Sequence, residues 1–168
     1  MVTVRMVTVR EKTPADAEVV AAYLDDAWGG PIVVSHGVVY EFANIPGLLA
    51  ENDGELVGLA TYVEQDDALE IVTLNASRRT DGVGTLLLEA AARRARDRRL
   101  ARLWLVTTND NLDAMRFYQR RGLRMTRVLV GAMDQARDMK RSRGLSVDDE
   151  VGCYGIESRD EIVLEMRL

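Results

Sequence analysis

The chain has 168 residues, of which 47% are hydrophobic and 29% are charged, as expected for one globular domain with a sizeable core. A single cysteine, Cys153, excludes an intrachain disulfide, and a single histidine, His36, disfavours a cysteine- or histidine-based metal site, so we expect no metal. The formal net charge of −5 argues against broad binding of nucleic acid. No apolar run resembles a secretory signal or a membrane span, so we expect a cytoplasmic protein without a membrane partner.

The N-terminal part of the chain predicts one strand and one helix. Residues 1–10 contain the pentapeptide MVTVR twice, and each copy alternates as a strand does. Because one copy suffices for a strand, we interpret residues 1–5 as an extension. Thr13 then fits a helix N-cap followed by a proline, and the helix is expected to end near Trp28, before Gly29.

The next segment, Pro31 to Tyr62, is rich in turn residues and in short apolar runs. Residues 52–55, Asn-Asp-Gly-Glu, are typical of a tight hairpin turn. We expect strands at Ile32–Val34, Val38–Phe42, Leu48–Glu51 and Leu56–Val63. The centre of the protein is therefore predicted to be a meander of antiparallel strands.

The stretch from Leu69 to Leu88 joins a strand, a basic glycine turn and the start of a helix. Gly82 and Gly84 precede the helical pattern, and glycines at that place let a ligand approach bare backbone N–H groups. Those groups and the helix dipole favour an anion, so a phosphate-bearing ligand is the first hypothesis. A P-loop would need Lys and then Ser or Thr after the last glycine, and a dinucleotide turn would need a third glycine; the sequence has neither. A purely structural glycine turn is the alternative.

Further along, the periodicity predicts alternating helices and strands. The helix after the glycine turn reaches about Arg99, and we interpret its arginine-rich end as a solvated face. The strand Leu103–Thr107 that follows implies a right-handed crossover between parallel neighbours. The remaining expected elements are a helix capped near Asn111 and stopped by Gly122, a strand at Leu123–Val130, a helix from Ala132 to about Gly144, a loop at Ser146–Gly155 and a closing strand at Ile162–Leu168.

Two motifs, Arg79-x-x-Gly82-x-Gly84 and the run NLDAMRFYQRRGL from Asn111 to Leu123, together closely resemble those of the GNAT superfamily of acyl-CoA-dependent N-acyltransferases. The resemblance covers roughly Gly54 to Val128. It implies an α/β (α+β) fold with a central mixed, mostly antiparallel sheet of about six to seven strands, splayed between the fourth and fifth strands and flanked by helices. We expect a single GNAT-like domain over residues 1–168, with an atypical helix, loop and strand at 131–168.

The resemblance implies acetyl-CoA as the co-substrate. In the family, backbone N–H groups of the glycine turn hold the pyrophosphate, the pantetheine arm lies like an added strand against the fourth strand, and an asparagine bonds the arm. The matching cofactor-binding residues here are Leu74, Arg79, Thr80, Asp81, Gly82, Val83, Gly84, Thr85 and Asn111. Asp81 stands where many members carry a basic residue, and Asn111 is equally explained as a helix cap.

The resemblance also implies direct attack of a primary amine on the acyl thioester. Tyr118 matches the residue that protonates the leaving thiolate in many members, since a phenol with a pKa of about 10 suits a thiolate of similar basicity; Phe117 is expected in the core. A tyrosine that only packs the helix in place is the alternative.

Glu70 is the candidate base, directly or through water. Strand alternation is expected to put it on the same face as Val72 and Leu74, although a solvated strand carboxylate is an alternative interpretation. A backbone N–H near Leu74 would stabilise the charge that develops on the thioester oxygen.

The acceptor is expected to be a small-molecule or peptide amine. The side chains to inspect for it are Trp28, Ser35, His36, Tyr40 and Glu157. The helix from about Ala132 and the tail after it could cover the acceptor site or form a homodimer contact.

Two competing functions follow from the same motifs. One is a non-catalytic acyl-CoA-binding or partner-binding domain. The presence of Tyr118 and Asn111 together with an intact glycine turn argues against it. The other is an enzyme that acts on charged transfer RNA, against which stands the acidic composition.

Overall fold

The computed structural model describes residues 6–77, 82–147 and 149–168. The extension expected at residues 1–5, and Arg79, Thr80 and Asp81 of the expected cofactor cradle, lie outside the described residues. Within them the strands are β1 (Val7–Glu11), β2 (Ile32–Ser35), β3 (Val38–Glu41), β4 (Gly47–Asn52), β5 (Glu55–Gln65), β6 (Ala68–Ala76), β7 (Arg102–Thr108), β8 (Arg124–Leu129) and β9 (Glu161–Arg167). The α-helices there are α1 (Ala17–Trp28), α2 (Val83–Asp97), α3 (Leu112–Gln119) and α4 (Ala132–Ser142).

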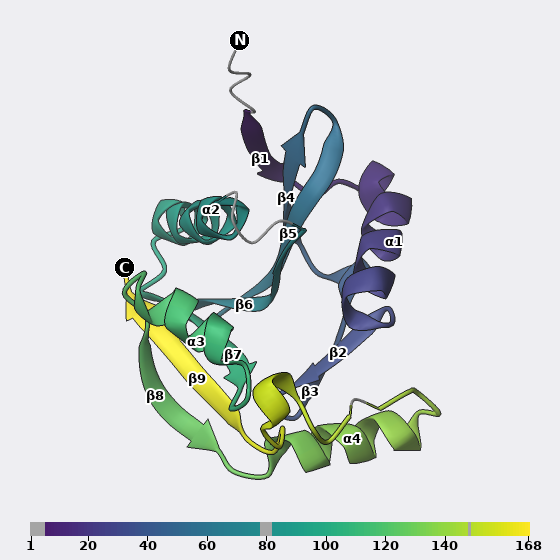
Figure 1. Ribbon diagram of the computed structural model, residues 1–168. Helices are drawn as coiled ribbons and strands as arrows, with labels where there is room; N and C mark the ends of the chain where they lie inside the picture. The colour runs from purple at the N-terminus through teal and green to yellow at the C-terminus, as the bar shows by residue number, and fades with distance from the viewer. Residues whose placement is uncertain (1–5, 78–81, 148) are drawn as a thin grey trace.

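Seven of these strands form one mixed sheet in the order β1-β4-β5-β6-β7-β9-β8 (Figure 1). Only β6 and β7 pair in parallel among them, which confirms the expected crossover through α2. Their pairing ends at Ile71 and Leu105, although β6 continues to Ala76 and β7 to Thr108. The sheet therefore splays between these two strands, as predicted.

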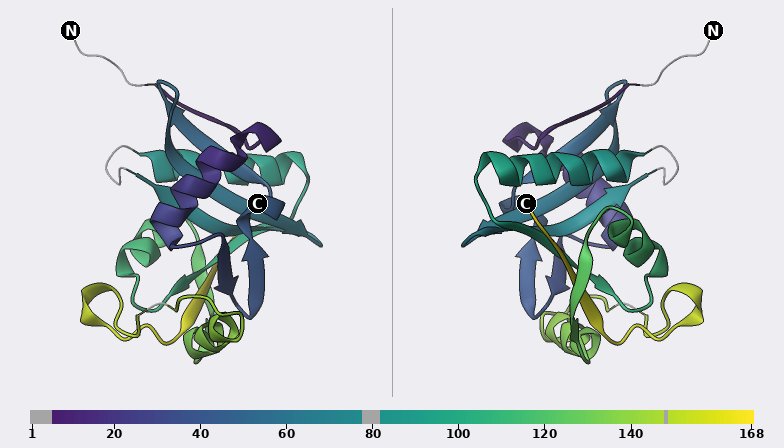
Figure 2. Two further views of the ribbon diagram at one scale, coloured as in Figure 1. Left: turned by 90° about the vertical axis from the view of Figure 1, so that its right-hand side faces the viewer. Right: turned by 90° about the vertical axis from the view of Figure 1, so that its left-hand side faces the viewer.

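The sheet is covered on both faces (Figure 2). The helix α2 packs on one face, while α1 and the hairpin β2–β3 cover the other. The hairpin is a separate two-stranded sheet, so the expected meander begins only at β4. His36 and Gly37, both with positive φ, form the turn between β2 and β3, and these two strands pair only with each other. The apolar face of the hairpin packs against the main sheet.

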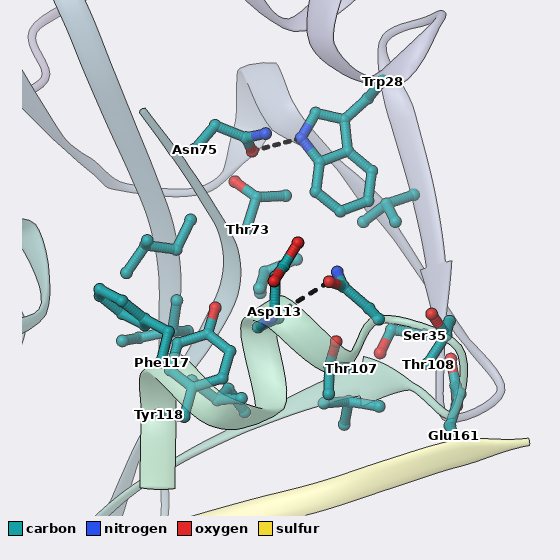
Figure 3. A pocket seen from close by; sticks show the side chains of 18 of the residues that line it. Trp28, Ser35, Thr73, Asn75, Thr107, Thr108, Asp113, Phe117, Tyr118 and Glu161 are labelled. Carbon is teal, nitrogen blue, oxygen red and sulfur yellow. Dashed lines mark hydrogen bonds between the residues drawn. The ribbon is translucent and has the colours of Figure 1, made fainter. Parts of the chain in front are cut away.

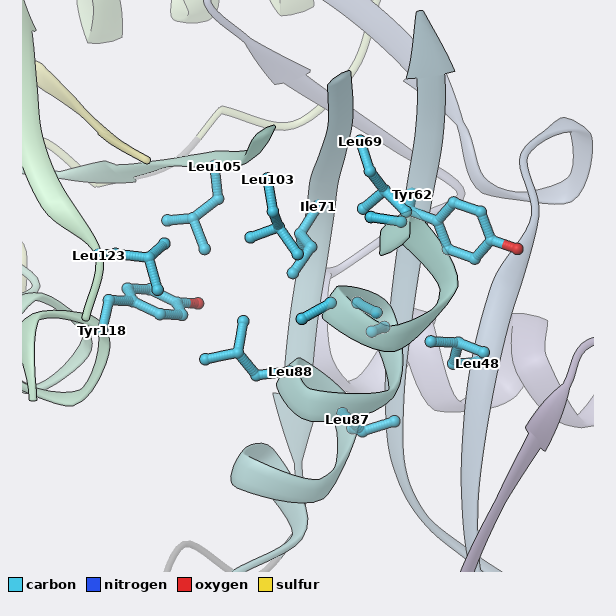
Figure 4. Close-up of a cluster of buried hydrophobic side chains, with 14 of the residues drawn as sticks. Leu48, Tyr62, Leu69, Ile71, Leu87, Leu88, Leu103, Leu105, Tyr118 and Leu123 are labelled. Carbon is cyan, nitrogen blue, oxygen red and sulfur yellow. The ribbon is translucent and has the colours of Figure 1, made fainter. Parts of the chain in front are cut away.

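The larger hydrophobic cluster fills the space between α2 and the sheet (Figure 4). Leu69, Leu87 and Leu103 are completely buried there, and burying each such side chain stabilises the fold by about 1.5–3 kcal/mol. Gly58 of β5 permits this close packing, because a Cβ atom at that position would lie 2.5 Å from Val83 Cγ1. The packing fixes the first turn of α2 against the sheet.

A network of charged side chains holds the start of α1. The carboxylate of Asp16 accepts hydrogen bonds from the main-chain N of Thr13 at 2.7 Å and from its hydroxyl at 2.8 Å. Arg10 Nη2 donates to Asp16 Oδ1 at 2.7 Å and to Glu51 Oε1 at 2.6 Å. The Arg10 guanidinium, with these Thr13 bonds, holds the pKa of Asp16 well below its ordinary value. These bonds lie at a 3-10 turn, Pro14–Asp16, which precedes α1 and has the expected Thr13 as its N-cap.

The C-terminal strand β9 lies inside the sheet, between β7 and β8. The sequence correctly indicated its alternating strand but gave no indication of this position. In the described part of the chain, no helix has the length and apolar character needed to cross a membrane.

Candidate active site

A cavity of about 1270 Å³ passes through the splay of the sheet (Figure 3). Every residue of β6 from Ile71 to Ala76 lines it, as do Leu105 to Thr108 of β7. These are the parts of the two strands that begin where their pairing ends. Main-chain N–H and C=O groups on this edge of β6 therefore lack a neighbouring strand, and an extended ligand with amide groups can pair with them.

One end of the cavity is the start of α2. Gly82, with φ of 74°, is the N-cap of this helix, and Gly82, Gly84 and Thr85 all line the cavity. A Cβ atom on Gly84 would lie 3.2 Å from Phe117 Cζ, so a side chain there would fill the passage. Arg121 donates to Thr85 Oγ1 at 2.6 Å and adds positive charge beside the helix N-terminus. This end of the cavity is therefore suited to an anion.

Val83 differs from the other expected cofactor residues of the turn. Its side chain is buried in the core under α2, and it is not among the residues that line the cavity. Only its main chain is available to a ligand at the helix N-terminus.

A β-bulge at Val72 overturns one expectation about β6. Thr61 of β5 pairs with Thr73 and Tyr62 pairs with Ile71, so Val72 has no partner on β5. The extra residue shifts the alternation by one position. Leu74 therefore packs toward α2, whereas Val72 packs toward α1. The expectation that Glu70 shares a face with Leu74 is wrong: Glu70 lies on the side of Val72 and of the β2–β3 hairpin.

The helix α3 brings Phe117 and Tyr118 to the splay. Tyr118 is 8% exposed, and both residues line the cavity. The Tyr118 ring packs in the core while its hydroxyl points toward the cavity (Figures 3 and 4). Burial raises the pKa of Tyr118 to about 12. Phe117, expected in the core, packs at its edge and forms part of the cavity wall.

Asn111 is both a helix cap and a cavity residue. Its Oδ1 accepts a hydrogen bond from the main-chain N of Ala114 at 3.1 Å, which satisfies one of the free N–H groups at the start of α3. The same residue lines the cavity.

Glu70 lies at the centre of a buried polar group with His36 and Tyr40. Its Oε1 is 2.7 Å from His36 Nε2, and its Oε2 accepts a hydrogen bond from the Tyr40 hydroxyl at 2.9 Å. The bond to Glu70 raises the pKa of His36 above its ordinary value, while burial raises that of Tyr40. Glu70 is 5% exposed and is not among the residues that line the cavity.

Three other residues were expected at the acceptor site: Trp28, Ser35 and Glu157. Trp28 and Ser35 line the cavity, and the Trp28 indole N–H donates to Asn75 Oδ1 across it. Glu157 is exposed and does not line the cavity, and its main-chain oxygen accepts a hydrogen bond from Asn109.

Sequence reasoning missed Glu161, which lines the cavity beside Ser35 and Thr108 (Figure 3). It is 3% exposed, and its Oε2 accepts a hydrogen bond from the main-chain N of His36 at 2.8 Å. The local sequence carries no signal for it, because the contact with His36 joins residues 125 positions apart. In the described ranges, no cluster of three or more His, Cys, Asp and Glu side chains could hold a metal ion.

Comparison with known proteins agrees with this arrangement. Residues 19–123 match the model of the acetyltransferase (GNAT) family. The chain is 37% identical over 152 residues to the uncharacterized protein YxbD of Bacillus subtilis (strain 168), covering 90% of this chain and 92% of that one. It is 32% identical over 116 residues to streptothricin acetyltransferase of Streptomyces lavendulae, covering 66% and 60% of the two chains. The solved structure of a GNAT family acetyltransferase from Elizabethkingia anophelis with acetyl-CoA bound has a TM-score of 0.66 at 20% identity, covering 96% of this chain and 98% of that one.

Proposed function

Because the chain belongs to the acetyltransferase (GNAT) family, we propose that it transfers the acetyl group of acetyl-CoA to a primary amine by direct attack within a ternary complex. The observation that carries the proposal is the course of the cavity. It runs from the N-terminus of α2, along the unpaired edge of β6, to the hydroxyl of Tyr118.

The shape and charge of this cavity support the proposed cofactor site. The pyrophosphate of acetyl-CoA binds the main-chain N–H groups from Arg79 to Gly84, with Thr85 beside them. The pantetheine amides pair with the edge of β6 near Leu74, because strand addition satisfies main-chain groups that no other strand reaches. Asn111 faces the arm from α3.

The chemical step needs one acid and one base. The amine nitrogen attacks the thioester carbonyl carbon, the carbon–sulfur bond breaks, and the leaving thiolate takes the proton of the Tyr118 phenol, which solvent restores. An N–H group of the bulged strand near Leu74 stabilises the charge on the carbonyl oxygen. Burial raises the pKa of Tyr118 to about 12, so the phenol is fully protonated at neutral pH but is a weaker acid than the ordinary phenol that matches a thiolate.

Glu70 is the proposed base for the amine proton. Neither Glu70 nor His36, whose Nε2 lies 2.7 Å from Glu70 Oε1, lines the cavity, so the proposed route of the proton to Glu70 is through water. The hydrogen bond from Tyr40 orients the carboxylate for this role.

The test is a turnover assay with an amine panel. The protein is mixed with acetyl-CoA and with small amines, N-terminal peptides, lysine derivatives and streptothricin, the last because of the relative named above. Thiol release and the mass of the acetylated amine are both followed. Stoichiometric binding of acetyl-CoA without turnover of any amine would instead support a non-catalytic acyl-CoA-binding domain.

A further inference from the structure

Three titratable residues from separate elements meet beside the acceptor end of the cavity. Glu70 comes from β6, His36 from the β2–β3 turn and Glu161 from the start of β9. The His36 side chain contacts Glu70 at 2.7 Å, and its main-chain N donates to Glu161 at 2.8 Å. The two carboxylates are 5% and 3% exposed.

The group carries an excess of negative charge. In the part of the chain that the structure describes, His36 is the cation that contacts Glu70 and Glu161, and the buried Lys140 of α4 lines the same cavity without being among the charges that act on Glu161. His36 supplies at most one positive charge against two carboxylates. A buried charge without a partner is costly, and burial accordingly raises the pKa of Glu161 above its ordinary value. A cation in the cavity would remove this cost.

Glu161 can reach such a cation. It lines the cavity, and only its Oε2 has a hydrogen-bond donor among the described residues. Nearby, Asp110 lines the same cavity, is 4% exposed, and has an Oδ1 atom without a hydrogen-bond partner in the described ranges. Burial opposes its charge, but the hydroxyls of Thr108 and Ser158 and the N–H of Cys153 hold the pKa of Asp110 below its ordinary value. Two buried acidic residues, Glu161 and Asp110, therefore lie at this end of the cavity.

The position of Glu161 separates it from the reacting centre. Glu161 pairs with Thr108, three residues beyond Leu105, where the pairing of β6 and β7 ends. Because β7 lies between β6 and β9, two interstrand spacings of about 4.8 Å each put Glu161 roughly 10 Å across the sheet from β6, along which the thioester is proposed to bind. A cation at Glu161 is thus a different group from the amine that attacks the thioester.

We propose that Glu161 is a specificity-determining residue that binds a second positive charge on the acceptor, so that diamines and basic amino-acid derivatives are preferred over simple amines. This inference rests on the proposed function, and it names the class of substrate. Asp110 strengthens the negative potential around that second charge.

The test compares matched acceptors and matched variants. Acetylation of 1,4-diaminobutane and 1,5-diaminopentane is measured against 1-aminobutane and 1-aminopentane, with native protein, Glu161→Gln and Glu157→Gln. We expect kcat/KM to favour the diamines at least about tenfold, a difference of roughly 1.4 kcal/mol. Glu161→Gln should abolish that preference through KM, whereas Glu157→Gln, which alters an exposed acid outside the cavity, should retain it.

A binding measurement separates this inference from the proposed function. Both amine classes are titrated calorimetrically into the protein loaded with CoA. Diamine binding that depends on Glu161, without any turnover, would support the inference and contradict the proposed activity. Acetylation of both amine classes with equal kcat/KM would overturn the inference but agree with the proposed activity. A preference for diamines that is unchanged in Glu161→Gln would have the same meaning. If that variant does not fold, the preference of the native protein decides alone, and its absence overturns the inference.

Discussion

Tyr118 and Phe117 are neighbours on α3, with ring centroids 5.2 Å apart and ring planes at 80°, yet they lie differently at the cavity. Phe117 packs under the guanidinium of Arg121, which follows α3 and bonds Thr85 of α2. Tyr118 enters the core and points its hydroxyl to the splay. The core fixes the ring, and the hydroxyl is left for the ligand.

Tyr118→Phe is expected to lower kcat by tenfold or more with little change in the affinity for acetyl-CoA. The hydroxyl has no hydrogen-bond partner among the described residues, so its loss should leave the thermal unfolding midpoint nearly unchanged. Steady-state kinetics and calorimetry with CoA measure the two effects. Tyr62→Phe, at a buried tyrosine outside the cavity, is the control. Unchanged kcat in Tyr118→Phe would remove this residue from the mechanism.

Gly82→Ala is expected to weaken acetyl-CoA binding, and the loss of affinity should exceed what its loss of folding stability would cause. Gly82 has φ of 74° at the N-cap of α2, and Gly131 has φ of 71° at the N-cap of α4, so alanine at either place costs about 1 kcal/mol of unfolding free energy. Only Gly82 lines the cavity. Thermal unfolding and CoA titration of Gly82→Ala and Gly131→Ala should therefore agree in stability loss and differ in affinity. Equal CoA affinities of the two variants would contradict the proposed pyrophosphate site.

Glu70→Gln is expected to lower kcat and to shift the titration of His36 to lower pH. The hydrogen bond to Glu70 raises the pKa of His36, so removing the carboxylate returns it toward the ordinary value. His36 is the only histidine, and a tag-free protein therefore gives a single imidazole signal by NMR. The stabilisation from a raised histidine pKa is complete below the unfolded value and is lost as the pH rises through the folded value. An unshifted imidazole titration would show that the pair is not formed in solution.

Asp16→Asn is expected to destabilise the protein at neutral pH but not at strongly acidic pH. The pKa of Asp16 is lowered by Arg10 and Thr13, so its contribution to the free energy of unfolding is present above the ordinary value of 3.8 and is lost as the pH falls through the folded value. Thermal unfolding across that range measures the difference from the native chain. Asp25→Asn, at an exposed position of α1, is the control. A destabilisation that persists at the lowest pH would have to come from packing and not from the charge.

Much of the fold could be predicted because local rules govern it. The turn at Asp53 and Gly54, the glycine before α2 and the cap at Asn111 each depend on a few adjacent residues. The position of β9 could not be predicted, since strand alternation defines a strand and its faces but not its neighbours.

The candidate site was harder to predict from the sequence, because one extra residue in β6 moves the side chains that follow it to the opposite face of the sheet. Alternation placed Glu70 with Leu74, and the bulge at Val72 separates them. Glu161 escaped notice for a related reason: its closeness to His36 spans 125 positions and depends on where β9 enters the sheet. Long-range placement of this kind leaves no trace in the local pattern.

The insertion of β9 between β7 and β8 has a consequence for biosynthesis. Every other strand emerges from the ribosome before β9, yet β8 is joined to the sheet only through it. Until β9 docks, the edges of β7 and β8 with which it pairs are open, and Glu161 is absent. Pairing of β9 with β7 and β8 can therefore form only after both have been synthesised, and a chain interrupted before Glu161 exposes their strand edges to chaperones or proteases.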